Sequence, residues 1–299
     1  MTLKIEVPPG SYVIAASGGV DSMVLLDLLA DMAEASRGDI RLVAAHFDHG
    51  IRPDSALDRQ LVQDVAAARR LVFIHDEGKL GAEASEAAAR KARYAFLNQV
   101  KQAAGADAII TAHHQDDVLE TIIINWLRGT KSRGLSSLRS TADVMRPLLG
   151  VAKADIRAYA ATRQLEWRED STNEDEKYLR NYVRRQLMPR LDDRARRQLL
   201  ARSERAAELN DAIGALTGGY LKQFTSPTSL DRAQYRELPE EVSREVLAEW
   251  LRRHTEVGIT SKLLHRLDTA IRTGRNGSRV DIANGLSFEL GREQVELAD

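Results

Sequence analysis

The sequence contains no cysteine. This absence excludes disulfides, zinc sites with thiolate ligands, cysteine-held iron–sulfur clusters and a persulfide carrier. The chain also lacks an apolar run of about 18 residues, the length that crosses a bilayer. Residues 1–10 lack the basic and then apolar order of a secretory signal. We therefore expect a cytoplasmic protein with no membrane partner.

The chain also lacks an excess of charge of either sign, because its net charge is only -1 over 299 residues. With 43% hydrophobic and 29% charged residues, the composition is that of a globular protein long enough for about two domains. Although the net charge is small, acidic and basic residues are distributed unevenly along the chain. Nine arginines lie between Arg180 and Arg205, whereas residues 165–177 hold six acidic residues. Such segregation is expected if one face meets a polyanion.

Residues 17–22 read Ser-Gly-Gly-Val-Asp-Ser and lie between the apolar run Tyr12–Ala16 and the helical pattern that starts at Met23. Adjacent glycines let the backbone approach a bound group closely, and the following helix N-terminus favours an anion. No lysine follows the glycines, which argues against the γ-phosphate cradle of kinases and GTPases. The plainer interpretation is a tight strand-to-helix turn with capping serines.

Apolar segments of strand length alternate with helical patterns through the first half of the chain. We expect strands at 12–16, 40–47, 71–74 and 107–112, and helices near 55–70, 85–104 and 118–128. Strands that alternate with helices of ten or more residues predict an α/β fold with a parallel, doubly wound sheet covered on both faces. In such folds ligands bind at the carboxyl ends of the strands.

Three polar clusters lie directly after predicted strands, at residues 17–22, 46–52 and 113–120. Because the carboxyl ends of parallel strands share one edge of the sheet, we expect these clusters to form a single active site. Their histidines and carboxylates would also suit divalent metal ions. One interpretation is Mg²⁺ held largely by nucleotide phosphates and one or two carboxylates. The alternative, a two-metal phosphoesterase, is disfavoured because it leaves Ser17–Ser22 unexplained.

Two helical segments carry polar side chains at spacings that are compatible either with stabilisation of the helix or with a role in a functional site. Asp117 and Glu120 lie three residues apart at a helix start, where carboxylates are favourable in any protein. The segment Glu86–Leu97 places Glu86, Arg90 and Arg93 or Tyr94 along one stripe, as a salt-bridged helix face also would.

The second half of the chain is expected to be mainly helical. A basic loop at residues 128–146 precedes a helix near 153–163, and helical pattern then persists to about Phe224. Two or three short helices follow, and Val280–Leu290 alternates with period two around Asn-Gly, which predicts a β-hairpin. We expect a catalytic domain at 1–195, a helical linker at 196–228 and a small C-terminal domain, structural or tRNA-binding, at 229–299.

Together these segments resemble a known family. The loop at residues 17–22 is similar to the PP-loop of ATP pyrophosphatases, and the series of segments resembles the tRNA(Ile)-lysidine synthetases in order, over about the first two-thirds of the chain. The matching segments are Ser17–Ser22, His46–Arg52, Glu86–Leu97, Thr111–Thr121, Arg146–Leu149, Asp170–Asn173 and Arg180–Arg184. The resemblance and the absence of cysteine together disfavour a sulfur-transferring member of the superfamily.

The resemblance implies that ATP, Mg²⁺ and L-lysine are used to replace the C2 oxygen of the wobble cytidine of an isoleucine tRNA with a CAU anticodon. AMP and pyrophosphate would be released after an adenylated cytidine forms. It implies that the phosphate loop binds ATP through Ser17, Gly18, Gly19, Val20, Asp21 and Ser22, with Asp21 as the metal ligand. It further implies that Arg93 and His113 act with Asp21 in catalysis and that Asp117 and Glu120 hold the lysine ammonium.

The basic segments are the candidate tRNA contacts, at Arg128, Lys131, Arg133, Arg180, Arg184 and Arg185. A homodimer is an assembly compatible with the sequence. Two other functions stay open. An adenylating, amidotransferase-like PP-loop enzyme acting on another substrate would need no basic flank, and a non-catalytic, nucleotide-gated tRNA-binding protein would release no pyrophosphate.

Overall fold

The computed structural model describes residues 3–50, 55–78, 86–130, 132–136, 138–169, 179–224, 226, 228–255, 257–283 and 285–298. The chain divides into two compact units, Met1–Glu204 and Arg205–Asp299. The division falls inside the 32-residue helix α8 (Asp193–Phe224), within the stretch expected as a helical linker. The described residues contain no helix that is long and apolar enough to cross a membrane.

The first unit is built on a five-stranded sheet in the order β3-β2-β1-β4-β5. Its strands are β1 (Gly10–Ala15), β2 (Ile40–Asp48), β3 (Val72–Glu77), β4 (Ala108–Ile110) and β5 (Val144–Met145). Every pairing is parallel, which confirms the predicted doubly wound sheet. The basic segment at 128–146 was expected as a loop, but it ends in the short edge strand β5.

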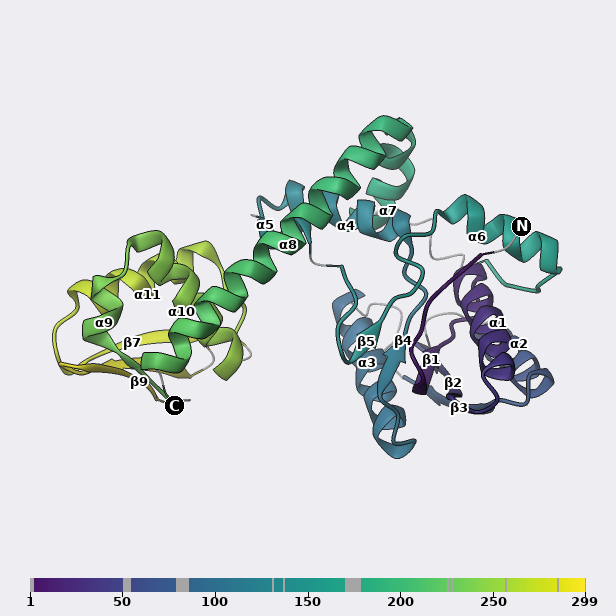
Figure 1. The fold of residues 1–299 in the computed structure, drawn as a ribbon, viewed down its shortest axis with the longest axis horizontal. Coiled ribbons are helices and arrows are strands. Elements are labelled where there is room, and N and C mark those ends of the chain that lie inside the picture. Colours follow the sequence, from purple (N-terminus) through teal and green to yellow (C-terminus); the bar gives the residue numbers. More distant parts are fainter. Residues whose placement is uncertain are drawn as a thin grey trace. The chain divides into compact units, whose positions relative to one another are not determined.

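Helices connect these strands (Figure 1). They are α1 (Val20–Ala35), α2 (Ser55–Ala68), α3 (Glu86–Ala103), α4 (Gln115–Leu127), α5 (Ser132–Leu135), α6 (Lys153–Arg163) and α7 (Leu179–Tyr182). A π-helical turn, η2 (Val183–Leu187), and a short 3₁₀ turn, η3 (Met188–Arg190), follow α7. The helices predicted from Met23 and near residues 55–70, 85–104, 118–128 and 153–163 are confirmed by α1, α2, α3, α4 and α6.

Alternate side chains of the buried strands face two separate layers of helices. Tyr12 and Ile14 of β1 pack with α1 and with Ile156 and Tyr159 of α6. Val13, between them, packs with Phe96 and Leu97 of α3 on the other face. Since successive strand residues point to opposite faces, this alternation explains why β1 is a continuous apolar run.

The order of the strands locates the binding edge. The chain moves outward from β1 to β2 and β3, then returns to place β4 on the other side of β1. Loops that leave the carboxyl ends of β1 and β4 therefore turn to opposite faces and open a crevice between them. The Ser17–Ser22 loop and the His113–Glu120 segment begin at this crevice.

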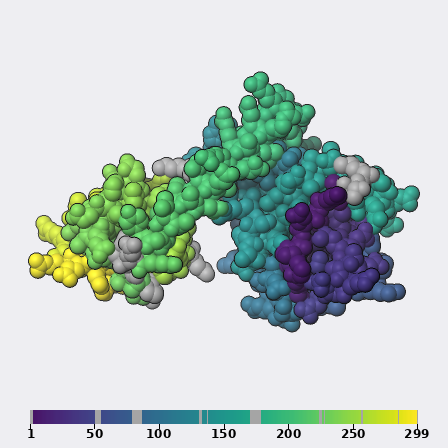
Figure 2. All heavy atoms as spheres, viewed as in Figure 1, coloured from purple at the N-terminus to yellow at the C-terminus, as the bar shows by residue number. Residues whose placement is uncertain are grey.

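The described part of the second unit contains the C-terminal part of α8 and a four-stranded antiparallel sheet in the order β6-β9-β8-β7, with three further helices. Its strands are β6 (Ser229–Asp231), β7 (Ser278–Ala283), β8 (Leu286–Leu290) and β9 (Gln294–Ala298), and its helices are α9 (Arg232–Glu237), α10 (Glu240–His254) and α11 (Ser261–Thr273). The pairing of β7 with β8 confirms the predicted hairpin. Trp250 and Phe288 are fully buried in its core, and the space-filling view shows this unit, green to yellow, as a closely packed body (Figure 2).

Candidate functional site

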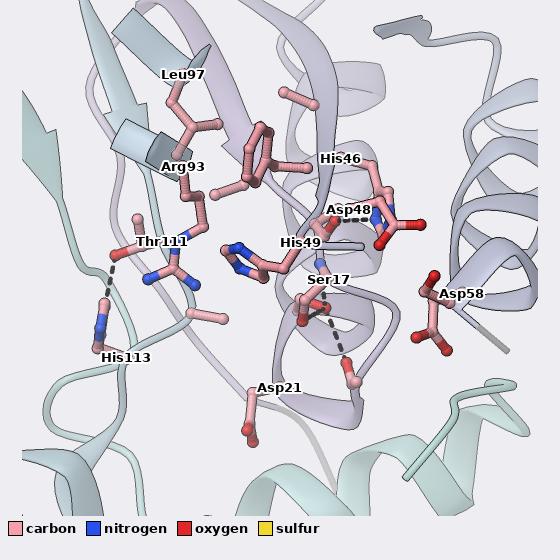
Figure 3. A pocket seen from close by; sticks show the side chains of 18 of the residues that line it. Ser17, Asp21, His46, Asp48, His49, Asp58, Arg93, Leu97, Thr111 and His113 are labelled. Carbon is pink, nitrogen blue, oxygen red and sulfur yellow. Dashed lines mark hydrogen bonds between the residues drawn. The ribbon is translucent and has the colours of Figure 1, made fainter. Parts of the chain in front are cut away.

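A cavity of about 360 Å³ opens at the carboxyl ends of β1, β2 and β4. Its wall includes seven of the site residues expected from the sequence: Ser17, Gly19, Asp21, Ser22, Arg93, His113 and Asp117. In Figure 3, Arg93 and His113 approach from one side, and Ser17 and His46 lie on the other. Segments far apart in the chain thus meet in one cavity.

Hydrogen bonds between its own serines shape the loop at residues 17–22. The Ser22 hydroxyl accepts the Ser17 backbone N–H at 3.1 Å and donates to the Gly19 carbonyl at 2.9 Å. The two serine oxygens lie 3.2 Å apart. Gly19 is the N-cap residue of α1, and glycine has no side chain that could bind the N–H groups of the first turn. Those groups suit an anion.

Two features favour glycine at position 18. Its φ is +88°, which is the left-handed region, and a Cβ there would lie 3.2 Å from the Cβ of Asp58. Arg168 supports the loop from the same side, because its backbone N–H donates to the Gly18 carbonyl at 3.0 Å and its Nε to Asp58 at 2.8 Å. The loop conformation is therefore fixed by residues from α2 and from the segment after α6.

Asp21, in the first turn of α1, is held by two cationic or polar side chains. Lys153 Nζ donates to both carboxylate oxygens at 2.6 Å. His114 Nε2 lies 3.6 Å from Asp21 Oδ2. Burial raises the pKa of the Asp21 carboxyl, but His114 and Lys153 outweigh burial and hold it below its ordinary value. Asp21 is therefore a carboxylate at neutral pH.

His46 lies in β2 and is held by the residue that follows β1. His46 is buried, and its Nδ1 lies 2.9 Å from the Ala16 carbonyl. Burial lowers the pKa of the His46 ring below its ordinary value, although the hydrogen bond to Ala16 and the carboxylate of Asp48 oppose this. Among the residues that the structure describes, no three His, Asp or Glu side chains converge as a metal-binding group.

His113 follows β4, and its Nδ1 lies 2.8 Å from the Thr111 hydroxyl. Burial lowers the pKa of His113 to about 4, and the guanidinium of Arg93 acts in the same direction. The ring is therefore neutral at pH 7. It shares the cavity wall with Arg93, from α3, so one neutral and one cationic hydrogen-bonding side chain lie at the same end of the site.

Asp117 and Glu120 differ in their surroundings. Asp117 lines the cavity and accepts the His114 backbone N–H at 2.9 Å, as part of the capping box that starts α4. Glu120 is only 1% exposed and accepts from Arg184 Nε at 2.6 Å and Nη2 at 3.0 Å. Burial raises the pKa of Glu120 above its ordinary value despite Arg184. Asp117 faces the cavity, whereas Glu120 joins α4 to η2.

The sequence model of the PP-loop domain matches residues 3–191. The curated tRNA(Ile)-lysidine synthase of Francisella tularensis subsp. holarctica is 32% identical over 297 residues, which cover 96% of this chain and 73% of the relative. The enzyme of the same name from Thermus thermophilus is 39% identical over 210 residues, or 67% of this chain and 40% of the relative. The chain belongs to the PP-loop family of tRNA(Ile)-lysidine synthases.

One solved structure outside this family has a similar fold. The U34-tRNA thiolase NcsA from Methanococcus maripaludis superposes with a TM-score of 0.56 at 15% identity, covering 68% of this chain and 73% of that one. At this identity the two proteins share the fold alone. NcsA carries a [4Fe-4S] cluster, whereas this lysidine-synthase-family chain has no cysteine to ligate one.

The basic residues expected to contact tRNA lie away from the cavity wall. Arg128 and Arg185 are exposed, Arg133 is half-buried, and Lys131 lies outside the described residues. Arg180 and Arg184 extend toward Glu120, with Arg180 Nε 3.6 Å from Oε2. The structure therefore joins a predicted lysine-binding residue to two predicted tRNA-binding residues.

Sequence reasoning gave no role to three residues that hold the site together, Lys153, Thr111 and Asp58, and it considered His114 only among the possible metal ligands. His114 and Thr111 were inside segments that carry the family resemblance, so proximity to His113 could have indicated them. Lys153 stands at the predicted start of a helix and just after the Arg146–Leu149 segment. Its contact with Asp21 is separated by 132 residues, which no local pattern indicates.

Proposed function

We propose that this chain ligates lysine to C2 of the wobble cytidine of an isoleucine tRNA with a CAU anticodon, forming lysidine and converting ATP to AMP and pyrophosphate. The observation that carries the proposal is the single cavity that combines the phosphate loop with Arg93, His113 and Asp117. Membership of the tRNA(Ile)-lysidine synthase family supports it.

The chemistry requires two displacements. A C2 carbonyl oxygen is a poor leaving group, so it first attacks the α-phosphorus of ATP while the bond to the bridging oxygen breaks and pyrophosphate leaves. The cytidine then carries an AMP ester at C2. The ε-amine of lysine attacks that carbon, loses a proton, and AMP leaves.

The loop at residues 17–22 is the proposed phosphate site. The Gly18 and Gly19 backbone and the first-turn N–H groups of α1 would hold phosphate oxygens, and the Ser17 and Ser22 hydroxyls would hold others. Asp21 fits a Mg²⁺ ion whose other ligands come mainly from the nucleotide, because it is one ionised carboxylate at the wall of the cavity. The ion would neutralise phosphate charge.

Arg93 and His113 are proposed to stabilise the adenylated cytidine. The guanidinium of Arg93 can donate to phosphate oxygens with a fixed geometry. The neutral His113 ring can accept or donate a hydrogen bond without placing a second positive charge beside Arg93.

The lysine pocket is proposed at the start of α4. Asp117 presents a carboxylate to the cavity, where it would hold the α-ammonium of lysine. Glu120, one turn further along α4, would support that pocket and exchange its contact with Arg184 for one with the substrate. A base must also take the proton of the ε-ammonium before the amine can attack.

The tRNA is proposed to bind along two basic clusters, one formed by Arg128, Lys131 and Arg133 and the other by Arg180, Arg184 and Arg185. Phosphate contacts supply most of the affinity for nucleic acid. In a single-stranded anticodon loop, moving a base out of its stack and into an active site costs little free energy. Because its proposed substrate is a tRNA, we propose that the protein acts in the cytoplasm. The homodimer stays a prediction, and light scattering over a concentration series would test it.

The test is a product analysis with ATP labelled on its α- and γ-phosphates, in the presence and absence of the tRNA. Labelled AMP and pyrophosphate that appear only with the tRNA would support the proposal. ADP and phosphate as the tRNA-dependent products would contradict it. Binding of nucleotide and tRNA without hydrolysis of ATP would favour the non-catalytic, nucleotide-gated tRNA-binding protein. Hydrolysis of ATP without salt-sensitive tRNA binding would favour an amidotransferase-like enzyme.

A further inference from the structure

Lys153 is the first residue of α6, and its ammonium contacts the phosphate loop. Nζ lies 2.6 Å from both oxygens of Asp21, which lines the cavity. The two side chains are 29% and 27% exposed, and Lys153, which is not itself part of the cavity wall, reaches that wall through its contact with Asp21. No role in the mechanism proposed above has been given to Lys153.

The Ser17–Ser22 loop lacks the lysine that P-loops carry beside their glycines. In this fold a lysine reaches the corresponding loop from another helix, 132 residues along the chain. Its helix starts after Ala152, which has no side chain that could bind the first-turn N–H groups. The ammonium of Lys153 therefore lies beside Asp21 in the first turn of α1, and a cation next to a helix N-terminus favours an anion with more than one negative charge.

An alternative is that the pair only fastens α6 to α1. That connection is already made elsewhere. Asp27 of α1 accepts from Tyr159 at 2.9 Å and from Arg163 Nε at 3.0 Å, and Asp27 is only 2% exposed. Ile156 and Ala160 are fully buried in the shared core. Because α6 is fixed by this buried network, the accessible Lys153–Asp21 pair is not needed to hold it.

We infer that Lys153 is a catalytic residue that donates hydrogen bonds to the pyrophosphate portion of ATP. The inference rests on the proposed function. When the cytidine oxygen bonds to the α-phosphorus, the electron pair of the breaking bond goes to the bridging oxygen, and the departing pyrophosphate gains one negative charge. The ammonium of Lys153 stabilises that charge, having exchanged one or both contacts with Asp21 for phosphate oxygens.

The test compares Lys153→Met with Asp21→Asn, since each removes the same ion pair. Binding of pyrophosphate and of AMP is measured by calorimetry in metal-free buffer. Lys153→Met should weaken pyrophosphate binding about 10-fold or more, because a hydrogen bond to a charged group is lost, and change AMP binding less than about twofold. Asp21→Asn should bind pyrophosphate as tightly as the wild type or more tightly, because it removes a negative charge.

A second readout is the single-turnover rate of tRNA adenylation, which should fall about 100-fold in Lys153→Met and recover in part in Lys153→Arg. The matched control is Lys101→Met, which breaks the 2.6 Å ion pair of Lys101 with Asp143 outside the cavity wall. It should match the wild type in binding and rate.

Equal losses of pyrophosphate binding in Lys153→Met and Asp21→Asn would overturn the inference, because the pair would then be a tether. Wild-type pyrophosphate binding in Lys153→Met would overturn it as well. Failure of the wild-type protein to form AMP and pyrophosphate would instead contradict the proposed function, so the two failures are distinguishable.

Discussion

Glu120 of α4 and Arg184 of η2 form a two-point contact, in which the carboxylate accepts from Nε at 2.6 Å and from Nη2 at 3.0 Å. The carboxylate is buried, and the arginine is 38% exposed. A residue expected to hold lysine and a residue expected to hold tRNA are thus partners of each other. Binding of either substrate at this point would change the partner available to the other.

The first prediction concerns Glu120→Gln, which removes charge with little change in size. The concentration of lysine needed for half-maximal rate should rise about 10-fold, because a charge-assisted hydrogen bond contributes about 1.5–3 kcal/mol. ATP affinity and lysine-independent pyrophosphate release should stay unchanged, because adenylation precedes the attack of the amine. Steady-state kinetics with lysine varied and ATP saturating would measure this.

Asp116→Asn is the matched control for Glu120→Gln, because Asp116 also lies on α4, also stands outside the cavity wall and also pairs with an arginine, Arg196, at 3.4 Å, yet no part in lysine binding is proposed for it. Its lysine requirement should equal that of the wild type. Loss of ATP binding in Glu120→Gln with an unchanged lysine requirement would assign the carboxylate to the nucleotide site instead.

The second prediction concerns His113, whose pKa of about 4 is set first by burial. Arg93→Met removes a nearby positive charge and should raise the pKa of His113 toward its ordinary value of 6.5. Asp117→Asn removes a negative charge and should lower the pKa further. Imidazole NMR over a pH series, with the His113 signal assigned by its loss in His113→Gln, would measure both shifts, and shifts of the same sign would contradict the site electrostatics.

The same pKa has a consequence for stability. Because the folded-state value lies below the ordinary 6.5, the unfolded chain binds the proton more readily between pH 4 and 6.5. The contribution of the neutral ring is therefore fully present above about pH 6.5 and is lost as the pH falls toward 4. Urea unfolding at pH 7 and pH 5 should show a smaller loss of stability in His113→Gln than in the wild type.

Much of this architecture could be predicted from the sequence, because the features concerned are local. Apolar runs such as Tyr12–Ala16 predicted the central strands, and the alternation in Val280–Leu290 predicted the hairpin. The two-residue strand β5 and the three-residue strand β6 are too short to leave a periodic pattern. They form because distant chain segments offer them partners, as β9 does for β6.

The site was predicted in the same uneven way. The Ser17–Ser22 loop and its place after a strand were visible in the sequence. The cavity wall includes residues of this loop and the last residue of the strand before it, Ala15. The ion pairs of the site were not. Lys153 and Asp21 are 132 residues apart, and Arg184 and Glu120 are 64 apart. Such partners depend on how α6 and η2 pack, which composition and spacing do not specify.

The third prediction concerns the two basic clusters. Arg128→Gln and Arg185→Gln, both at exposed positions, should each weaken tRNA binding and reduce the slope of log K against log salt by about one unit. ATP affinity should be unchanged. Arg41→Gln is the control, because Arg41 is exposed near the amino end of β2, opposite the cavity. Filter binding over a salt series would measure the slopes, and a slope equal to that of the Arg41 variant would remove that cluster from the tRNA surface.

The fourth prediction separates the backbone strain at Gly18 from its steric contact. Gly18→Ala and Gly105→Ala both place a side chain at positive φ, at +88° and +58°, but the added Cβ meets Asp58 only at Gly18. Each should lose about 1–2 kcal/mol of stability from the backbone conformation. Gly18→Ala should also lose ATP binding, since the loop must move. Retention of normal ATP affinity by Gly18→Ala would show that the loop does not hold the phosphates.

The most direct measurement of the central claim combines the protein with ATP, isotopically labelled lysine and an isoleucine tRNA transcript that bears a CAU anticodon, followed by nucleoside mass analysis. We expect a cytidine derivative that carries the labelled lysine at the wobble position, with one AMP and one pyrophosphate released for each lysine incorporated. Unmodified wobble cytidine, recovered while the same reaction consumes ATP to AMP and pyrophosphate, would contradict it.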